Sequence, residues 1–142
     1  MTFMSDNVFF DTNILVYAND ASEPAKKQIA RKLIKDALLN KTAVISIQVL
    51  SEFWVTVTQK IQTPLPEPVA EKQIELFEIM EIVNLDLLLF KSALKLKKMN
   101  HLPYWDSLIV AAANYSDCKI LYSEDLNNGQ QISNTTIVNP FV

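Results

Sequence analysis

The chain has 142 residues, a formal net charge of −3 and 49% hydrophobic residues. This length suits one compact domain, so we expect residues 1–142 to form a single domain. No apolar stretch approaches the roughly 18 residues that a membrane span requires, and the first residues lack the basic flank and cleavage pattern of a signal peptide. We therefore expect a cytoplasmic protein without membrane association.

The scarcity of three residue types excludes several kinds of site, because the chain has one Gly, one His and one Cys. Gly129 alone cannot form a glycine-rich phosphate-binding loop. His101 and Cys118 cannot build a structural zinc cage, and Cys118 has no partner for an internal disulfide. No G-x-S-x-G motif supports a serine nucleophile. What remains is chemistry carried out by carboxylates, with or without a metal ion.

The first half of the chain predicts two strands and two helices. A strand is expected over 7–10 and a second over 42–47. Between them, Ser22 and Pro24 begin an amphipathic helix. Its apolar residues recur every three or four positions and should face the core: Ile29, Leu33, Ile34, Ala37 and Leu38. Residues 47–60, preceded by Ser46 as a cap, predict a helix that is apolar on nearly every side and therefore buried.

The second half continues the alternation of helices and strands. After three prolines, a helix is expected over 68–80, with Val69, Ile74, Phe77 and Met80 on its inner side. Further segments follow in order: a strand over 81–85, helices over 87–100 and 105–117, and strands over 119–123 and 135–139. This order predicts an α/β protein, a three-layer α/β/α sandwich with a mainly parallel sheet of about five strands.

Four acidic residues stand in or beside apolar segments: Asp11, Glu52, Asp106 and Asp125. Each also has a structural interpretation. Asp11 and Asp106 can cap helices, and Asp125 can belong to the turn over 124–129. Glu52, in the middle of an apolar helix, caps nothing and is explained only if that face is exposed.

Buried carboxylates need a cation or take up a proton. The lysines and the single arginine, Arg31, lie mostly on faces that should be solvated, and none is inside the apolar segments that hold the four acids. A divalent cation is the simpler explanation. Ligation by oxygen alone selects a hard ion, Mg²⁺ or Mn²⁺.

The same residues resemble a known family, the PIN domains, and within it the VapC-type toxins of bacterial toxin–antitoxin systems. Four segments carry the resemblance over nearly the whole chain: FFDTNILVYA, SIQVLSEFW, YWDSLIVAAA and LYSEDLNNGQ. The resemblance implies that the metal ligands and catalytic acids are Asp11, Glu52, Asp106 and Asp125. It also implies supporting roles for Asn13 and Ser123.

The fourth acid has two candidates, because Glu124 and Asp125 are adjacent. In an extended chain successive side chains point in opposite directions, so at most one should face the site, and we favour Asp125. The resemblance implies that Asn13 either orders the Asp11 loop or forms a hydrogen bond to a ligand, and the structural interpretation is that Asn13 simply caps a helix.

The family resemblance implies a metal-dependent endoribonuclease in which Mg²⁺ or Mn²⁺ activates water for hydrolysis of RNA phosphodiester bonds. It also implies inhibition by a cognate antitoxin and a homodimer. Setting aside the four site acids raises the formal charge from −3 by four units to +1. Two rows on helices are candidate phosphate contacts, or plain solvated faces: Lys27, Arg31 and Lys35, and Lys91, Lys95 and Lys98. For Trp105, we favour core packing over stacking on a base.

Two other functions remain open. One is a catalytically silent PIN module that binds RNA or a protein partner. The other is a haloacid-dehalogenase-like phosphatase with Asp11 as nucleophile, which is weaker because that family needs a second acid where this chain has Asn13.

Overall fold

A computed structural model describes residues 6–142 and contains one six-stranded sheet in the order β3-β2-β1-β4-β6-β5. Every strand pair is parallel except β5 with β6. The strands are β1 (Val8–Phe10), β2 (Ala43–Ser46), β3 (Glu81–Val83), β4 (Ile120–Tyr122), β5 (Gln131–Ile132) and β6 (Thr135–Val138). The expected α/β sandwich with a mainly parallel sheet is therefore confirmed.

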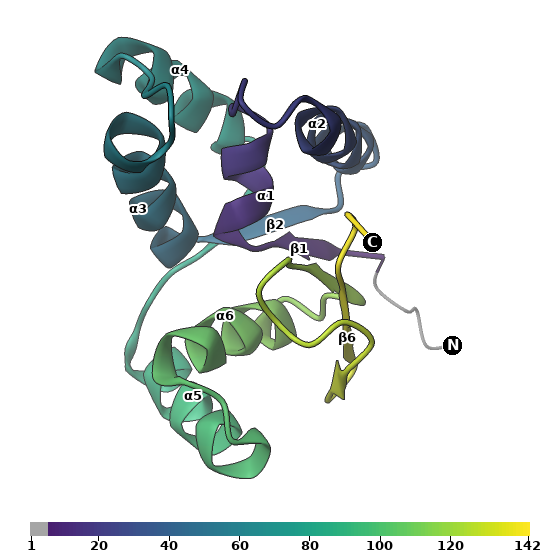
Figure 1. Cartoon of the computed structure of the whole chain (residues 1–142). Coiled ribbons are helices and arrows are strands. Elements are labelled where there is room, and N and C mark those ends of the chain that lie inside the picture. The colour runs from purple at the N-terminus through teal and green to yellow at the C-terminus, as the bar shows by residue number, and fades with distance from the viewer. Residues whose placement is uncertain (1–5) are drawn as a thin grey trace.

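Helices cover both faces of the sheet (Figure 1). One layer holds α1 (Thr12–Tyr17), α2 (Pro24–Leu39), α3 (Ile47–Val55) and α4 (Glu67–Phe77). The other layer holds α5 (Leu87–Asn100) and α6 (Tyr104–Tyr115), which pack against each other. None of the helices formed by residues 6–142 is long and apolar enough to cross a membrane.

The strand order reverses at β1, and this reversal positions the site. The chain runs from β1 outward through β2 to β3 and then returns to place β4 on the other side of β1. The return brings α5 and α6 to the opposite face (Figure 1). A crevice at the carboxyl ends of strands on either side of such a reversal is where ligands bind in open α/β sheets. Here those ends lead into Asp11 after β1 and Ser123 after β4.

All five expected strands are present, and β5 is the additional one. It is only two residues long and pairs antiparallel with β6, so it carries almost no periodic signal. The expected helix over 47–60 divides into α3 and a π-helical turn, η1 (Thr56–Lys60). The backbone N–H of Ile61 bonds to the carbonyl of Thr56 and closes this wider turn. As predicted, Ser46 caps α3 and accepts a hydrogen bond from the Val49 amide.

The core is built on Phe9, Phe10, Phe53 and Phe77, which are fully or almost fully buried. Five apolar side chains expected inside are exposed: Ile29, Ile47, Val55, Val69 and Trp105. Trp105 is 62% exposed, so the core interpretation of Trp105 is wrong. The expectation that the helix over 47–60 is buried on nearly every side is also wrong, because only one face of it, with Val49, Phe53 and Val57, is buried. Cys118 is buried, and burial raises the pKa of its thiol to about 12, with smaller contributions from neighbouring acids.

Candidate active site

Asp11 follows β1 directly and is 8% exposed. Its backbone is extended, and one carboxylate oxygen accepts a hydrogen bond from the Thr12 amide at 2.7 Å, so Asp11 does cap α1. The other oxygen accepts from the Ser123 hydroxyl at 2.7 Å. The capping explanation and the site explanation are therefore compatible, because capping uses only one of the two oxygens.

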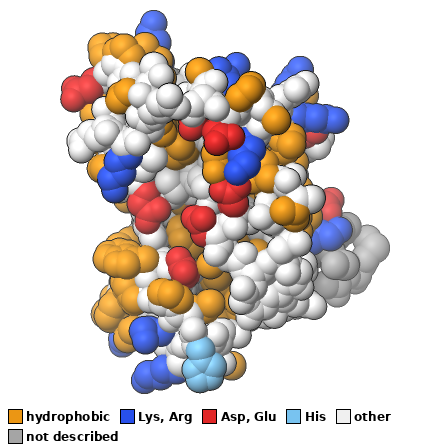
Figure 2. Space-filling view, viewed as in Figure 1, with side chains coloured by type: hydrophobic (Ala, Val, Ile, Leu, Met, Phe, Trp, Pro, Cys, Tyr) orange, Lys and Arg blue, Asp and Glu red, His pale blue; other side chains and the backbone are white. Residues whose placement is uncertain are grey.

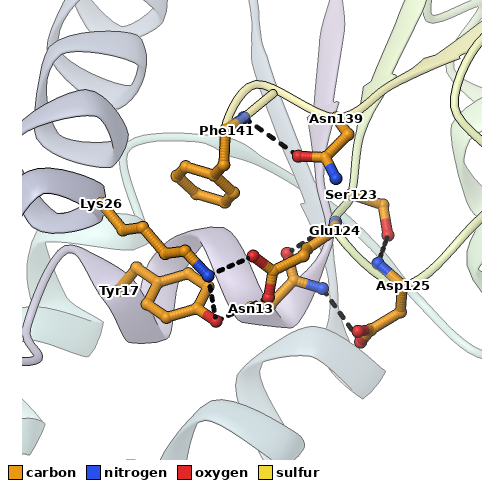
Figure 3. A network of polar contacts seen from close by, with 8 residues as sticks. All are labelled: Asn13, Tyr17, Lys26, Ser123, Glu124, Asp125, Asn139 and Phe141. Carbon is orange, nitrogen blue, oxygen red and sulfur yellow. Dashed lines mark hydrogen bonds and ion pairs between the residues drawn. The ribbon is translucent and has the colours of Figure 1, made fainter. Parts of the chain in front are cut away.

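The tripeptide that follows β4 sends its three side chains to different partners (Figure 3). Ser123 is fully buried and bonds to Asp11, and its hydroxyl oxygen also accepts from the backbone amides of Asp125 and Leu126. Glu124 turns toward α2 and forms an ion pair with Lys26 at 2.6 Å.

Asp125 accepts a hydrogen bond from the Asn13 amide nitrogen at 3.1 Å. Glu124 and Asp125 thus point apart, as the alternation argument requires. Asp125 is the member of the pair that stands beside the other acids, since it raises the pKa of both Asp11 and Asp106.

Glu52 projects from α3, where it is partly buried rather than fully enclosed. One of its oxygens accepts from the Thr12 hydroxyl at 2.7 Å and the other from the Gln48 amide nitrogen at 2.9 Å. The same Gln48 nitrogen also donates to the Trp105 carbonyl at 3.2 Å, so Gln48 connects α3 to the first turn of α6.

Asp106 lies in that first turn of α6 and is partly buried. Desolvation is the largest cause that raises its pKa, followed by the charges of Asp125 and Glu52. Trp105 precedes it and contacts the Tyr104 ring edge to face, with ring centroids 5.0 Å apart. The exposed indole therefore stands next to an acid of the site.

The charges of Glu52 and Asp125 act on both Asp11 and Asp106, so the four acids lie in one region of the molecule. The pKa of Asp11 rises from 3.8 to about 6: burial is the largest cause, hydrogen bonds from Ser123 and Thr12 oppose it, and the charges of Glu52 and Asp125 add to the rise. Lysine and arginine do not relieve this repulsion, because the one ion pair within residues 6–142 joins Lys26 and Glu124. Neutral hydroxyl and amide donors hold three of the carboxylates instead, those of Asp11, Glu52 and Asp125.

These side chains offer oxygen ligands to a cation, which is the donor set of Mg²⁺ and Mn²⁺. In the arrangement that residues 6–142 adopt, however, no three acidic, histidine or cysteine side chains form a group that could hold a metal ion. We therefore expect the carboxylates to shift toward a common point when a metal ion binds. The Gln48 side-chain oxygen is a further unsatisfied acceptor, because it is buried and without a hydrogen-bond partner among the described residues.

A groove of about 850 Å³ begins at this site. Glu52, Asn13 and Asp125 line it, and it continues along α1 and η1 past Tyr17 to Lys60, whereas Asp11 and Asp106 lie beyond its lining. Figure 2 shows acidic side chains gathered in the middle of this face, between the two helical layers, with most lysine and arginine side chains nearer its rims. The acidic end of the groove is the part where a cation would offset the negative charge.

The structure adds two residues to the site that sequence reasoning did not identify, Thr12 and Gln48. Thr12 follows Asp11 directly, donates its backbone amide to Asp11 and its hydroxyl to Glu52, and so connects the first acid to the second. Gln48 precedes Glu52 by four positions, which places both on one face of a helix. That spacing was the available signal for Gln48, whereas the role of Thr12 depends on a contact between segments that are 40 positions apart.

Comparisons with known proteins agree on the fold. The chain resembles a toxin–antitoxin complex from Klebsiella pneumoniae, with a TM-score of 0.69 at 17% identity over 94% of this chain and 98% of that chain. It also resembles VapC20 of Mycobacterium tuberculosis, described as a toxin that cleaves the sarcin-ricin loop. The TM-score is 0.67 at 19% identity over 84% of this chain and 90% of that chain.

A third similar structure is VapBC2 of Rickettsia felis bound to a DNA fragment from its promoter, with a TM-score of 0.64 at 18% identity over 92% of this chain and 96% of that chain. A search of curated proteins finds no match. The model of the PIN domain matches residues 8–128, a span that includes all four acids. The chain therefore belongs to the PIN domain family.

Proposed function

We propose that this protein is a metal-dependent endoribonuclease and the toxin of a toxin–antitoxin pair. The observation that carries the proposal is that four acids from four separate segments lie in one region at the carboxyl edge of the sheet. There the charges of Glu52 and Asp125 add to the raised pKa of Asp11 and of Asp106, and no basic side chain among residues 6–142 forms an ion pair with any of the four. Such an arrangement costs stability unless it serves a ligand of positive charge.

Asp11 and Asp106 are the proposed closest ligands, with Glu52 and Asp125 binding directly or through water. A hard dication at this position would offset negative charge on a scissile phosphate and make water easier to deprotonate. The protein contributes orientation, because Ser123, Thr12 and Asn13 donate hydrogen bonds that fix Asp11, Glu52 and Asp125. A protein nucleophile is not required for this reaction.

The toxin assignment is supported by the structural relatives, which include toxin–antitoxin complexes and a toxin that cleaves the sarcin-ricin loop. We propose by analogy that a small antitoxin protein covers the groove and the acids, and that the protein acts in the cytoplasm. A homodimer also remains a prediction, which the mass of the purified protein in solution tests directly.

The experiment is RNA cleavage by the wild type, Asp11→Asn and Glu75→Gln, each with Mg²⁺, with Mn²⁺ and with EDTA. Glu75 is an exposed acid of α4 and serves as a matched control for the loss of one negative charge. We expect cleavage by the wild type and Glu75→Gln that EDTA abolishes, and a loss of at least about a thousandfold in Asp11→Asn.

Other outcomes identify the alternatives. RNA binding without cleavage, equal in the wild type and Asp11→Asn, would indicate a silent PIN module. Release of phosphate from small monoesters would indicate a phosphatase. For the toxin role, expression should arrest bacterial growth, and co-expression of the protein encoded next to it should restore growth; growth that is unaffected by active enzyme would contradict that role.

A further inference from the structure

Glu124 is adjacent to an acid of the site and is nevertheless directed away from it. Its two carboxylate oxygens accept hydrogen bonds from the Tyr17 hydroxyl at 2.5 Å and the Lys26 ammonium at 2.6 Å. Lys26 also lies 3.3 Å from the Tyr17 hydroxyl oxygen, so the three groups form a closed triangle (Figure 3). Both carboxylate oxygens of Glu124 are therefore occupied by donors from α1 and α2, which hold the side chain in place.

The aromatic ring of Phe141 packs against this triangle. The Phe141 ring meets the Tyr17 ring edge to face at 5.1 Å, and its centroid lies 5.6 Å from the Lys26 ammonium (Figure 3). The Tyr17 ring itself lies 4.7 Å from the same ammonium. Two aromatic rings thus shield the ion pair partly from water, and shielding strengthens a charged hydrogen bond. The three residues of the triangle come from different segments: Tyr17 from α1, Lys26 from α2 and Glu124 from the loop after β4.

The triangle is connected to the site through Asn13. The Asn13 side-chain oxygen accepts from the Glu124 backbone amide at 3.2 Å, while its nitrogen donates to the Asp125 carboxylate at 3.1 Å. Fixing Glu124 therefore fixes the backbone that Asn13 recognises, and Asn13 in turn orients Asp125. The Ser123 hydroxyl bonds to the Asp125 amide and to Asp11, so the same loop also orients the first acid.

We infer that Lys26, Tyr17 and Glu124 are positioning residues that hold the loop over 123–125 so that Asp125 faces the other acids. The inference rests on the proposed function for its consequence in catalysis, because it assigns a role within the same site. In this role the ion pair acts at a distance from the metal, through the Asn13 amide and the loop backbone. None of the three side chains is required to touch the metal or the scissile phosphate.

The principal test measures Mn²⁺ binding by calorimetry and RNA cleavage for Glu124→Ala, Lys26→Met and the double variant. Loss of a side chain that orients a metal ligand should weaken Mn²⁺ binding by about tenfold, and should lower kcat by a similar factor while KM changes less than about threefold. The double variant should be no worse than Glu124→Ala, because both changes break one ion pair. Lys26→Arg retains the pair and should stay within about twofold of the wild type.

Lys32→Met is the matched control, because Lys32 is an exposed residue of the same helix. It removes the same charge without touching the loop and should leave Mn²⁺ binding and kcat unchanged. Equal losses in Lys32→Met and Lys26→Met would mean that net charge, rather than positioning, governs the site. Wild-type Mn²⁺ affinity in Glu124→Ala would overturn the inference.

A measurement without metal separates this inference from the proposed function. The backbone amides of Glu124, Asp125 and Leu126 all donate hydrogen bonds that the triangle is inferred to protect. In EDTA, Glu124→Ala and Lys26→Met should speed hydrogen exchange at these amides by about tenfold, and Lys32→Met should not. If the wild type neither binds Mn²⁺ nor cleaves RNA, the proposed function fails, and unchanged exchange at these amides independently overturns the positioning role.

Discussion

The acids of this protein stand in two neighbouring regions that treat negative charge in opposite ways. In the triangle formed by Lys26, Tyr17 and Glu124, the carboxylate meets an ammonium group, and its pKa is lowered. At the sheet edge, Asp11 meets only neutral donors and other acids, and its pKa is raised to about 6. A carboxylate that is already paired has no capacity left for a cation, whereas one held by hydroxyl and amide groups keeps its charge available. Adjacent residues, Glu124 and Asp125, belong to the two different regions.

The largest expected effect separates these adjacent acids by activity. Asp125→Asn should lower kcat for RNA cleavage by at least about a hundredfold, because it removes a charge from the site itself. Glu124→Gln should lower kcat by less than about tenfold, because it only weakens the support of the loop. Single-turnover cleavage rates measure both. Equal losses would show that the division between the two regions has no functional meaning.

The pH dependence of stability should have opposite signs in the two regions. Because the folded state holds the Asp11 proton more tightly than the unfolded state does, ionisation of Asp11 costs up to about 3 kcal/mol as pH rises from 3.8 to about 6. Glu124 has a lowered pKa, so its contribution is present above its ordinary value of 4.5 and is lost as pH falls.

Urea denaturation in EDTA between pH 4 and pH 7.5 tests this dependence. The difference in unfolding free energy between Asp11→Asn and the wild type should grow toward the higher pH. A constant difference across that range would contradict a raised pKa for Asp11. Saturating Mg²⁺ should remove most of the difference, since a ligand that binds only the folded state stabilises it.

Single substitutions at neutral pH should show the same contrast on a smaller scale. Asp11→Asn should stabilise the metal-free protein by about 1–2 kcal/mol, which is less than the full cost of ionisation because the amide loses one accepted hydrogen bond. Glu124→Gln should destabilise it by less than about 1 kcal/mol, since the ion pair is partly exposed and water screens it. Thermal melting in EDTA measures both changes. Destabilisation by Asp11→Asn would mean that its hydrogen bonds outweigh the repulsion.

The smallest expected effect concerns Trp105, whose exposed ring lies outside both regions but next to Asp106. If it stacks on a base, Trp105→Ala should raise KM for RNA by about fivefold and leave kcat nearly unchanged. Trp105→Phe retains a flat ring and should recover most of the affinity. Tyr115→Ala, which removes another exposed aromatic side chain of α6, is the control. Equal KM values in all three variants and the wild type would exclude stacking.

Much of the fold was predictable because its elements have strong periodicity and clear boundaries. Ser46 and Asp86 cap α3 and α5 as their positions indicate, and the five expected strands all occur. The predictions that were wrong concern segments where the local sequence pattern carries little information. The π-helical turn η1 is part of an uninterrupted helical pattern, which does not predict where α3 ends. Trp105 lies in the first turn of α6, before the buried residues 107–113, and the apolar composition of that helix does not reveal that its indole is exposed.

The residues of the candidate site could be proposed from the sequence, and their catalytic role stays a prediction, whereas their contacts could not be predicted. Asp11, Glu52, Asp106 and Asp125 are conspicuous because acids are rare in apolar segments, and the sheet reversal places them in one region. Their partners are ordinary residues in ordinary contexts: Thr12 follows an acid and Lys26 lies on an amphipathic helix. The choice of Asp125 over Glu124 followed from alternation along the chain. The ion pair that directs Glu124 away from the site joins it to Lys26, 98 positions away in the sequence, and no local pattern predicts that contact.

The burial of Cys118 has a practical consequence for measuring the motions expected when a metal ion binds. A thiol that is inaccessible and has a pKa of about 12 is almost entirely uncharged at neutral pH, so maleimides and methanethiosulfonates should leave it unmodified in the folded protein. A cysteine introduced at the groove, for example at Lys60, would then carry a fluorophore or spin label at one defined position. Cys118 therefore does not need to be replaced before labelling, and reorientation of the carboxylates can be followed by spectroscopy in an otherwise native chain.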